Sequence, residues 1–237
     1  MNNKIKYEII LLVLITIVIF NTAIIMTADD NVQGDNVYNI TEVGHNKNGT
    51  VYKIVAGNAS SNDTVGIILG VHPREHEIHE AINNTINNIT GDNGSRNLTK
   101  KFVIYYVVVK DNISSRDDTR PAGENLAHKF IVPNIAKDKP FLVVDVHEIN
   151  PDYEYSNFIF SLSNRNAKID SYIKKITTDV NLVDYNFDEG TSPEKVTEPI
   201  AKKGINTLLM ETSITDSQSQ KQQTANNLIK SLDELTP

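Results

Sequence analysis

The sequence predicts an α/β domain with a mixed, mostly parallel sheet and helices on both faces, preceded by an N-terminal transmembrane helix. Short apolar runs at residues 64–71, 101–109 and 141–147 have the composition of buried strands. They alternate with segments such as residues 75–90, where apolar side chains recur every three or four positions as on an amphipathic helix. This alternation is typical of a sheet that helices cover on both faces.

The predicted transmembrane helix lies within residues 1–28. Residues 9–26 are apolar except for three polar side chains, and the stretch is long enough to cross a bilayer. Lysines precede it and aspartates follow it, so the positive-inside rule places the N-terminus in the cytoplasm and the rest of the chain outside a cell membrane. The alternative is a cleaved signal peptide and a secreted domain. Met26 makes a poor cleavage pattern, which favours a retained single-pass anchor.

Residues 29–49 are polar and are interpreted as a stalk, with the catalytic domain at residues 50–237. An external domain could be a glycoprotein, and the chain has nine Asn-x-Ser/Thr sequons. They begin at Asn39, Asn48, Asn58, Asn62, Asn83, Asn88, Asn93, Asn97 and Asn112. An Asn-rich chain also produces such sequons by chance, so the sequence does not identify which of them are used.

The composition restricts the chemistry. The chain has no cysteine, which excludes disulfides, thiolate metal sites and thiol nucleophiles. Any metal ion must therefore be held by His, Asp or Glu. The net charge of −7 and a pI near 5.4 argue against a nucleic-acid partner, for which a basic surface would be expected. The sequence gives no indication of the oligomeric state.

The remaining elements are predicted in order along the chain. Residues 50–56 partly alternate and are expected to form an edge strand, antiparallel to its neighbour. Residues 110–121 are polar and are interpreted as a loop, followed by a short helix at residues 123–132. The second half is predicted to contain strands at 141–147, 157–162 and 207–210 and helices at 166–180, 194–203 and from about 216.

Three polar side chains stand at the carboxyl ends of buried strands, where α/β sheets bind their ligands: His72, His147 and Glu211. Glu75 follows His72 by three residues, in the first turn of the predicted helix. Alone, His72 and Glu75 would suit an ion-paired helix start. Together with His147 they form a His₂Glu set, which suits one Zn²⁺ ion with an open position for water.

Hydrolysis at such a site also needs a general base and a fixed cation. Glu211 is the candidate base, because a carboxylate must take the proton of water and give it to the leaving amine. Arg116 and Arg120, in the predicted loop, are candidate cations for the negative charge that develops on the substrate oxygen. His76 and His79 are expected to be solvated or to lie beside the ligands, and strand alternation points Glu148 away from the cleft. Asp145 shares the face of His147 and either orients a ligand or is a buried structural carboxylate.

These motifs resemble the zinc carboxypeptidase superfamily, including its succinylglutamate desuccinylase/aspartoacylase branch. The matching segments are Gly70-Val71-His72-Pro73-Arg74-Glu75, Asp145-Val146-His147 and Met210-Glu211-Thr212, within residues 50–215. The resemblance implies that His72, Glu75 and His147 bind zinc and that Glu211 is the base. It further suggests Tyr185, five residues before Gly190, as a mobile-loop catalytic tyrosine.

The chain departs from the family where an Asn-Arg pair usually precedes the second histidine and binds the carboxylate terminus of the substrate. Asn164-Arg165 comes after His147 instead. Arg120 and Asn125, with Arg116, are the candidates to replace that pair, and Arg74 is a further candidate for substrate binding. The departure leaves exopeptidase specificity open.

Three functions remain in competition. The first is a membrane-anchored extracytoplasmic zinc metallopeptidase, carboxypeptidase-like, that cleaves an amide bond in cell-envelope peptides. The second is a deacylase of acyl-amino acids, which the missing Asn-Arg pair favours and an external location disfavours. The third is a non-catalytic relative that binds an envelope ligand, which the intact ligand and base residues disfavour.

Overall fold

The computed structural model describes residues 36–237, apart from residues 92–93, 95–96, 111–115, 164 and 188–191. The chain divides into two units, residues 1–33 and 34–237. The predicted transmembrane helix at 9–26 lies outside the described residues and stays a prediction. Within the described part of the chain, no helix is both long and apolar enough to cross a membrane.

The described residues form one eight-stranded sheet in the order β1-β2-β4-β3-β5-β8-β6-β7. The central strands β4, β3, β5 and β8 run parallel to one another, and β6 pairs with β7 in parallel. The pairs β1–β2, β2–β4 and β6–β8 are antiparallel, so the predicted mixed, mostly parallel sheet is confirmed. The strands are β1 (Asn36–Asn46), β2 (Gly49–Asn58), β3 (Thr64–Leu69), β4 (Lys101–Val109), β5 (Leu142–Ile149), β6 (Phe158–Ser161), β7 (Val183–Asp184) and β8 (Thr207–Ser213).

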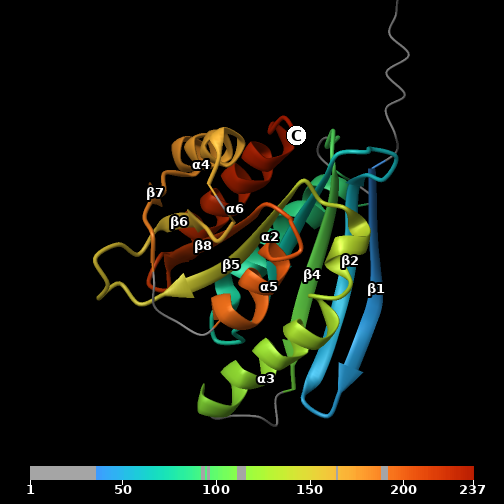
Figure 1. Cartoon of the computed structure of the whole chain (residues 1–237), viewed down its shortest axis with the longest axis vertical. Helices are drawn as coiled ribbons and strands as arrows, with labels where there is room; N and C mark the ends of the chain where they lie inside the picture. The colour runs from blue at the N-terminus through green and yellow to red at the C-terminus, as the bar shows by residue number, and fades with distance from the viewer. Residues whose placement is uncertain (1–35, 92–93, 95–96, 111–115, 164, 188–191) are drawn as a thin grey trace, which may run out of the picture. The chain divides into compact units, whose positions relative to one another are not determined.

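Helices cover both faces of the sheet (Figure 1). One face packs against α2 (His76–Thr90), α4 (Ala167–Val180) and α6 (Gln218–Asp233). The other packs against α3 (Arg116–Phe130), the π-helical turn η2 (Pro193–Thr197) and α5 (Glu198–Ala201), with the 3₁₀ turn η1 (Ile135–Asp138) nearby. Strand alternation divides the core accordingly, because Ile67 faces the first layer and Ile68 the second.

In the first layer, α4 and α6 each begin directly after a residue whose side chain caps the helix. The Asn166 side chain accepts hydrogen bonds from the backbone N–H groups of Lys168 and Ile169 at the start of α4. Ser217 and Gln220 form a reciprocal capping box at the start of α6. These caps satisfy N–H groups that have no partner within the helix.

Three predictions about the elements were wrong. Residues 36–46 form β1 rather than part of a stalk, and they make β2 an interior strand rather than an edge. The side chains of β1 are mainly polar and none of them is buried, so a hydrophobic pattern does not reveal its pairing. Helix α3 begins at Arg116, within the predicted loop, and it contains Pro121. Pro121 is the sixth residue of the helix, which continues through it at the loss of a backbone hydrogen bond, so the proline does not mark the boundary.

Candidate metal centre and active site

The turn between β3 and α2 presents the first two predicted ligands. Gly70, directly after β3, has a φ of +78°, and a Cβ there would overlap the carbonyl oxygen of Val107. The chain then turns so that the backbone N–H of Glu75 donates to the carbonyl of His72 over 3.0 Å. Both side chains are buried, and His72 Nδ1 lies 2.9 Å from Glu75 Oε1. A glycine and a single tight turn thus hold an imidazole and a carboxylate side by side.

His147 reaches the same point from β5. Its Nδ1 lies 3.1 Å from Nδ1 of His72 and 2.9 Å from Oε2 of Glu75. The candidate ligand atoms of the three residues all lie within 4.8 Å of one another. Zinc takes nitrogen and oxygen ligands at about 2.0–2.2 Å, which separates two ligand atoms of a tetrahedral site by about 3.4 Å. The His72, Glu75 and His147 side chains therefore fit one metal ion.

A carboxylate oxygen lies close to Nε2 of each imidazole, the ring nitrogen that is not in contact with the other candidate ligands. Asp145 Oδ1 lies 3.1 Å from Nε2 of His147, and Glu124 Oε1 lies 3.3 Å from Nε2 of His72. A carboxylate at this place can orient a ligating imidazole, with the proton on Nε2 and Nδ1 directed to the metal. Asp145 is itself held by Thr197, whose hydroxyl donates to Asp145 Oδ2 over 2.5 Å. The pKa of His147 is raised well above its usual value, because Asp145 and Glu75 outweigh the opposite effect of burial. Of the two readings of Asp145, the structure supports the one in which it orients a ligand.

Glu124 is a site residue that the sequence reasoning missed. It is buried on α3, and its Oε2 accepts a hydrogen bond from Lys195 Nζ over 2.8 Å. A signal was available, because Glu124 precedes the buried Ala127 by three residues and Ile131 by seven. A charged residue in line with the apolar stripe of a helix calls for a buried partner.

Glu211 faces the same point from β8. It lies directly opposite His147 in the parallel pair β5–β8, so both side chains are on one face of the sheet. Its Oε2 is buried and has no hydrogen-bond partner among the described residues. Burial, together with the negative Glu75 and Asp145, raises the pKa of Glu211 to about 8, although His147 and Arg120 act in the opposite direction. The structure therefore presents a basic carboxylate with free lone pairs.

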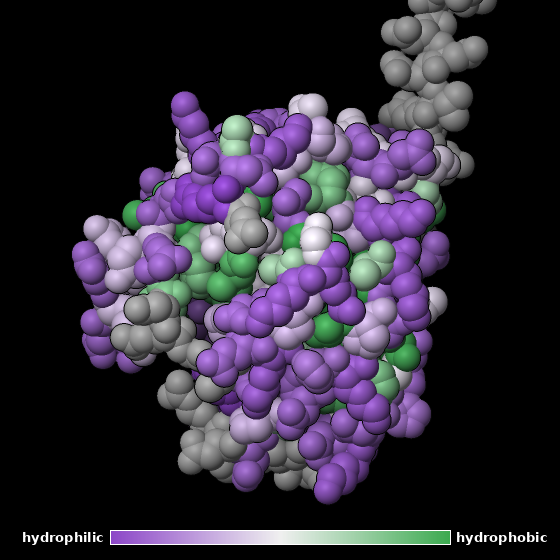
Figure 2. Space-filling view, viewed as in Figure 1, coloured by the Kyte–Doolittle hydropathy of each residue, from purple (hydrophilic) through white to green (hydrophobic). Residues whose placement is uncertain are grey.

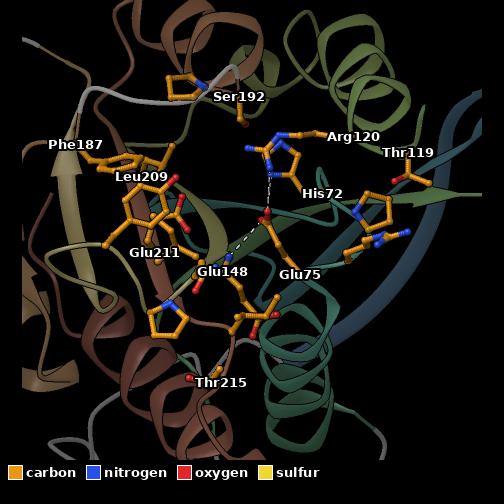
Figure 3. A pocket seen from close by; sticks show the side chains of 18 of the residues that line it. His72, Glu75, Thr119, Arg120, Glu148, Phe187, Ser192, Leu209, Glu211 and Thr215 are labelled. Atoms are coloured by element: carbon orange, nitrogen blue, oxygen red, sulfur yellow. Dashed lines mark hydrogen bonds and ion pairs between the residues drawn. The ribbon is translucent and has the colours of Figure 1, made fainter. Parts of the chain in front are cut away.

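A cavity of about 600 Å³ opens over these residues. One wall is polar, with His72, Arg74, Glu75 and Arg120. The opposite wall is apolar, and Figure 3 shows Leu209 and Phe187 on the side of Glu211 and Arg120 on the side of His72. The apolar wall consists of Ile149, Tyr153, Phe160, Phe187 and Leu209. In Figure 2, hydrophobic surface lies in a hollow over β6 and β8.

The candidate cations have different outcomes. Arg120 lines the cavity, with Nη1 at 3.6 Å from Glu75 Oε1 and Nε at 3.7 Å from Glu124 Oε1. Arg74 is exposed and also lines the cavity. The side chain of Arg116 lies outside the described residues.

Two candidates for substrate contact are not brought to the cavity. Asn125 is exposed on α3 and is not among the residues that line it, because the next position along a helix is rotated by about 100° from Glu124. The Tyr185 ring packs against Phe158 and Tyr155, with centroids 5.4 and 4.8 Å away, and does not line the cavity. The predicted roles of Asn125 and Tyr185 therefore have no geometric support here.

The predictions about three neighbouring side chains have different outcomes. His76 is exposed, as expected. His79 is neither solvated nor among the side chains that contact the ligand set: its Nδ1 accepts a hydrogen bond from the backbone N–H of Gly70 over 3.2 Å, and its Nε2 donates to the Val146 carbonyl over 2.8 Å. Burial lowers the pKa of His79 to about 4, so it is a neutral link between β3 and β5. Glu148 pairs with Lys221 of α6, but it also lines the cavity (Figure 3), contrary to the prediction that it points away from the cleft.

Solved structures of a metallo-carboxypeptidase, a desuccinylase and an amidase have a similar fold. The chain matches a metallo-carboxypeptidase from Burkholderia cenocepacia with a TM-score of 0.53 and 12% identity over 84% of this chain. It matches succinylglutamate desuccinylase from Vibrio parahaemolyticus with a TM-score of 0.53 and 11% identity over 85%. Murein-tripeptide amidase from Escherichia coli O157 gives a TM-score of 0.55 and 8% identity over 88%.

The lengths of these structures differ. The chain spans 97% of the amidase and 68% of the desuccinylase, but only 62 to 65% of three carboxypeptidase structures. No family model matches the sequence, and no curated protein does. These structures are only 8 to 12% identical to the chain, so the comparison confirms the expected fold and goes no further.

Proposed function

We propose that this protein is a zinc-dependent hydrolase that cleaves an amide bond. One observation carries the proposal: His72, Glu75 and His147 converge on one point, and Glu211, whose Oε2 has no hydrogen-bond partner among the described residues, lines the same cavity. Histidine and carboxylate ligands suit zinc, which is the metal we infer. A structural site would have no use for a fourth carboxylate beside it.

The residues around the cavity divide the chemistry between them. His72, Glu75 and His147 would hold the zinc ion, which when bound would supply Lewis acidity for the scissile carbonyl and for a water molecule. Glu211 takes the proton of the attacking water and delivers it to the leaving nitrogen, for which a raised pKa is suited. Arg120 lies beside Glu75 and supplies positive charge for the oxygen of the carbonyl group. Asp145 and Glu124 hold the two imidazoles in place.

The favoured substrate is a peptide, with carboxypeptidase-like cleavage of cell-envelope peptides. The likeness to murein-tripeptide amidase over almost its whole length supports this choice. The apolar wall favours an uncharged side chain next to the scissile bond. The N-terminal anchor, the location outside the membrane and the use of the sequons belong to the same proposal, and they rest on the sequence alone.

A deacylase of acyl-amino acids is the second candidate. The fold likeness to succinylglutamate desuccinylase supports it. Asn125 does not line the cavity, so one of the residues proposed to bind the terminal carboxylate of a peptide is missing from it. The third candidate, a non-catalytic ligand-binding relative, differs from both in one measurable respect, because it would not depend on the Glu211 carboxylate.

The test uses the purified full-length chain. Metal analysis should find one zinc per chain, and loss of the metal is expected for His72→Ala and His147→Ala. His76→Ala is the matched control, because His76 is exposed and should leave the metal in place. Mass spectrometry would then follow the cleavage of envelope-type peptides and of acyl-amino acids in parallel.

Glu211→Gln separates the enzyme from a binding protein. The variant should keep its zinc and lose about 10²–10⁴-fold in rate, the usual contribution of a general acid–base group. Zinc that persists in both histidine variants would refute the metal site. Equal behaviour of wild type and Glu211→Gln on every substrate would favour the binding function.

A further inference from the structure

The C-terminal helix α6 carries a buried lysine that forms ion pairs with two carboxylates, each close in sequence to a candidate metal ligand. Lys221 is in the first turn of α6, and its side chain is fully buried. Its Nζ lies 2.6 Å from Glu148 Oε1, pairs closely with Glu77 Oε2, and donates to the carbonyl of Ile214 over 3.1 Å. We call Lys221, Glu148 and Glu77 the lysine cluster.

The partners of Lys221 belong to the three segments that present the site. Glu77 is two residues after the candidate ligand Glu75, and Glu148 directly follows His147. Ile214 is three residues after Glu211, just past the end of β8. In addition, the backbone N–H of Glu148 donates to Oε2 of Glu75 over 3.3 Å. A single ammonium group is thus bonded to the neighbours of two metal ligands and of the base.

Stability alone does not explain such an arrangement. Removing an ammonium and a carboxylate from water is costly, and apolar side chains of similar volume often stabilise a fold equally well or better. The charged cluster instead supplies directional contacts that fix the relative positions of three segments, because Lys221 Nζ has a partner on each of them. Apolar replacements would fill the volume without fixing the relative positions of α2, β5 and the end of β8.

We propose that Lys221 is a positioning residue for the metal centre, holding Glu75 and His147 in register through Glu77 and Glu148. The proposal rests on the metal site of the proposed function. Of the three side chains of the lysine cluster, Glu148 lines the cavity, whereas Lys221 and Glu77 are not among its lining residues. The proposal predicts that the lysine cluster sets the metal affinity rather than the stability of the metal-free fold.

The test measures zinc affinity by competition with a chelating dye, and thermal unfolding of the metal-free protein, for the full-length chain. Lys221→Met/Glu148→Gln removes the buried ion pair but keeps its shape. We expect it to bind zinc about 10–100-fold more weakly, as other residues that support metal ligands do, and to unfold near the wild-type temperature when metal-free. The visible spectrum of the Co²⁺-loaded variant should also change, because it reports the ligand geometry.

Lys175→Met is the matched control. Lys175 also pairs with two carboxylates, Asp179 and Glu234, but it joins α4 to α6 away from the metal ligands. Its loss should leave the zinc affinity unchanged. A wild-type zinc affinity and Co²⁺ spectrum in Lys221→Met/Glu148→Gln would overturn the proposal.

Two further outcomes are decisive. If the double variant does not fold, Glu77→Gln decides, because Glu77 is 39% exposed and the Lys221–Glu148 pair remains. The proposal then requires weaker zinc binding in Glu77→Gln, and an unchanged affinity refutes it. Failure of the wild-type chain to bind zinc would instead refute the metal site itself, so the two failures are distinguishable.

Discussion

At the scale of single residues, the carboxylate proposed as the general base is held at a cost to the fold. Glu211 lies among other acidic groups, and its Oε2 has no described partner to offset its burial. Functional groups are often kept in environments that disfavour their working charge state. The metal-free protein should show this cost directly.

Glu211→Gln is expected to stabilise the metal-free protein, and more so at higher pH. The pKa of Glu211 rises from 4.5 to about 8 on folding, so the protonated form is the one that the fold favours. Its stabilising contribution is complete below pH 4.5 and is lost as the pH rises to about 8. The variant should therefore match wild type near pH 4.5 and exceed it by roughly 2 kcal/mol above pH 8, less than the full shift implies because water screens a partly exposed group.

Urea denaturation of both proteins at the two pH values, with a chelator present, measures this difference. Titrating groups far from Glu211 are common to the two proteins and their contributions cancel, whereas Glu75, Asp145 and His147 interact with Glu211 and titrate together with it. A stability difference that does not change with pH would contradict the environment described for Glu211.

The four central residues could be predicted from the sequence because strand ends and strand alternation determine where they point. His72, His147 and Glu211 each follow an apolar run, and the parallel register places the last two opposite each other. Glu124 could not be placed, because its approach to His72 depends on how α3 packs across the sheet. The same uncertainty in the phase of α3 led to the choice of Asn125.

At the scale of elements, the approach of α3 to the metal centre depends on one glycine. Gly123 lies where the helix crosses the turn after β3, and a Cβ there would overlap the carbonyl oxygen of Val71. Val71 directly precedes His72, and Glu124 directly follows Gly123. The contact between the two backbones therefore sets the distance between Glu124 and His72.

Gly123→Ala is expected to push α3 away from the turn and to weaken zinc binding. Overpacking of this kind typically costs about 1–3 kcal/mol, and we expect the zinc affinity to fall by about tenfold or more as Glu124 loses His72. Thermal unfolding and dye competition measure the two effects. Gly204→Ala is the comparison: Gly204 has a φ of +81° with open space around it, so its replacement should strain the backbone and leave zinc binding intact. Equal zinc affinity in the two variants would be inconsistent with a role for this contact.

Helix and strand boundaries were predictable where a cap or an apolar run marks them, as at the start of α4 and along β5. They were not predictable where the chain is polar. The β1 strand is stabilised by backbone pairing with β2, and a mainly polar strand at a sheet edge has no hydrophobic signature. Only the tertiary structure shows that it belongs to the domain.

At the scale of the whole molecule, the metal ligands connect separate parts of the chain. His72 and Glu75 belong to the β3–α2 turn, whereas His147 lies on the neighbouring strand β5. An ion that binds only the folded protein stabilises it by about 2.7 kcal/mol when its free concentration is a hundred times the dissociation constant.

Chelation should therefore lower the melting temperature of the wild-type chain, and added zinc should restore it. The expected change is several degrees, from about 2 to 4 °C per kcal/mol for a domain of this size. The melting temperature of His147→Ala should respond to neither treatment. An equal response of the wild type and this variant would indicate binding elsewhere.

The strand order has a consequence for how activity appears during synthesis. Strand β8 lies between β5 and β6, both of which precede it in the chain, and it alone pairs the β6–β7 ribbon with the rest of the sheet. In an emerging polypeptide, the three proposed metal ligands are synthesised before β8, the strand that carries the proposed base. Insertion of that strand closes the sheet and delivers Glu211 in the same event. A nascent chain could thus bind its metal early and still lack the proposed base until β8 has joined the sheet.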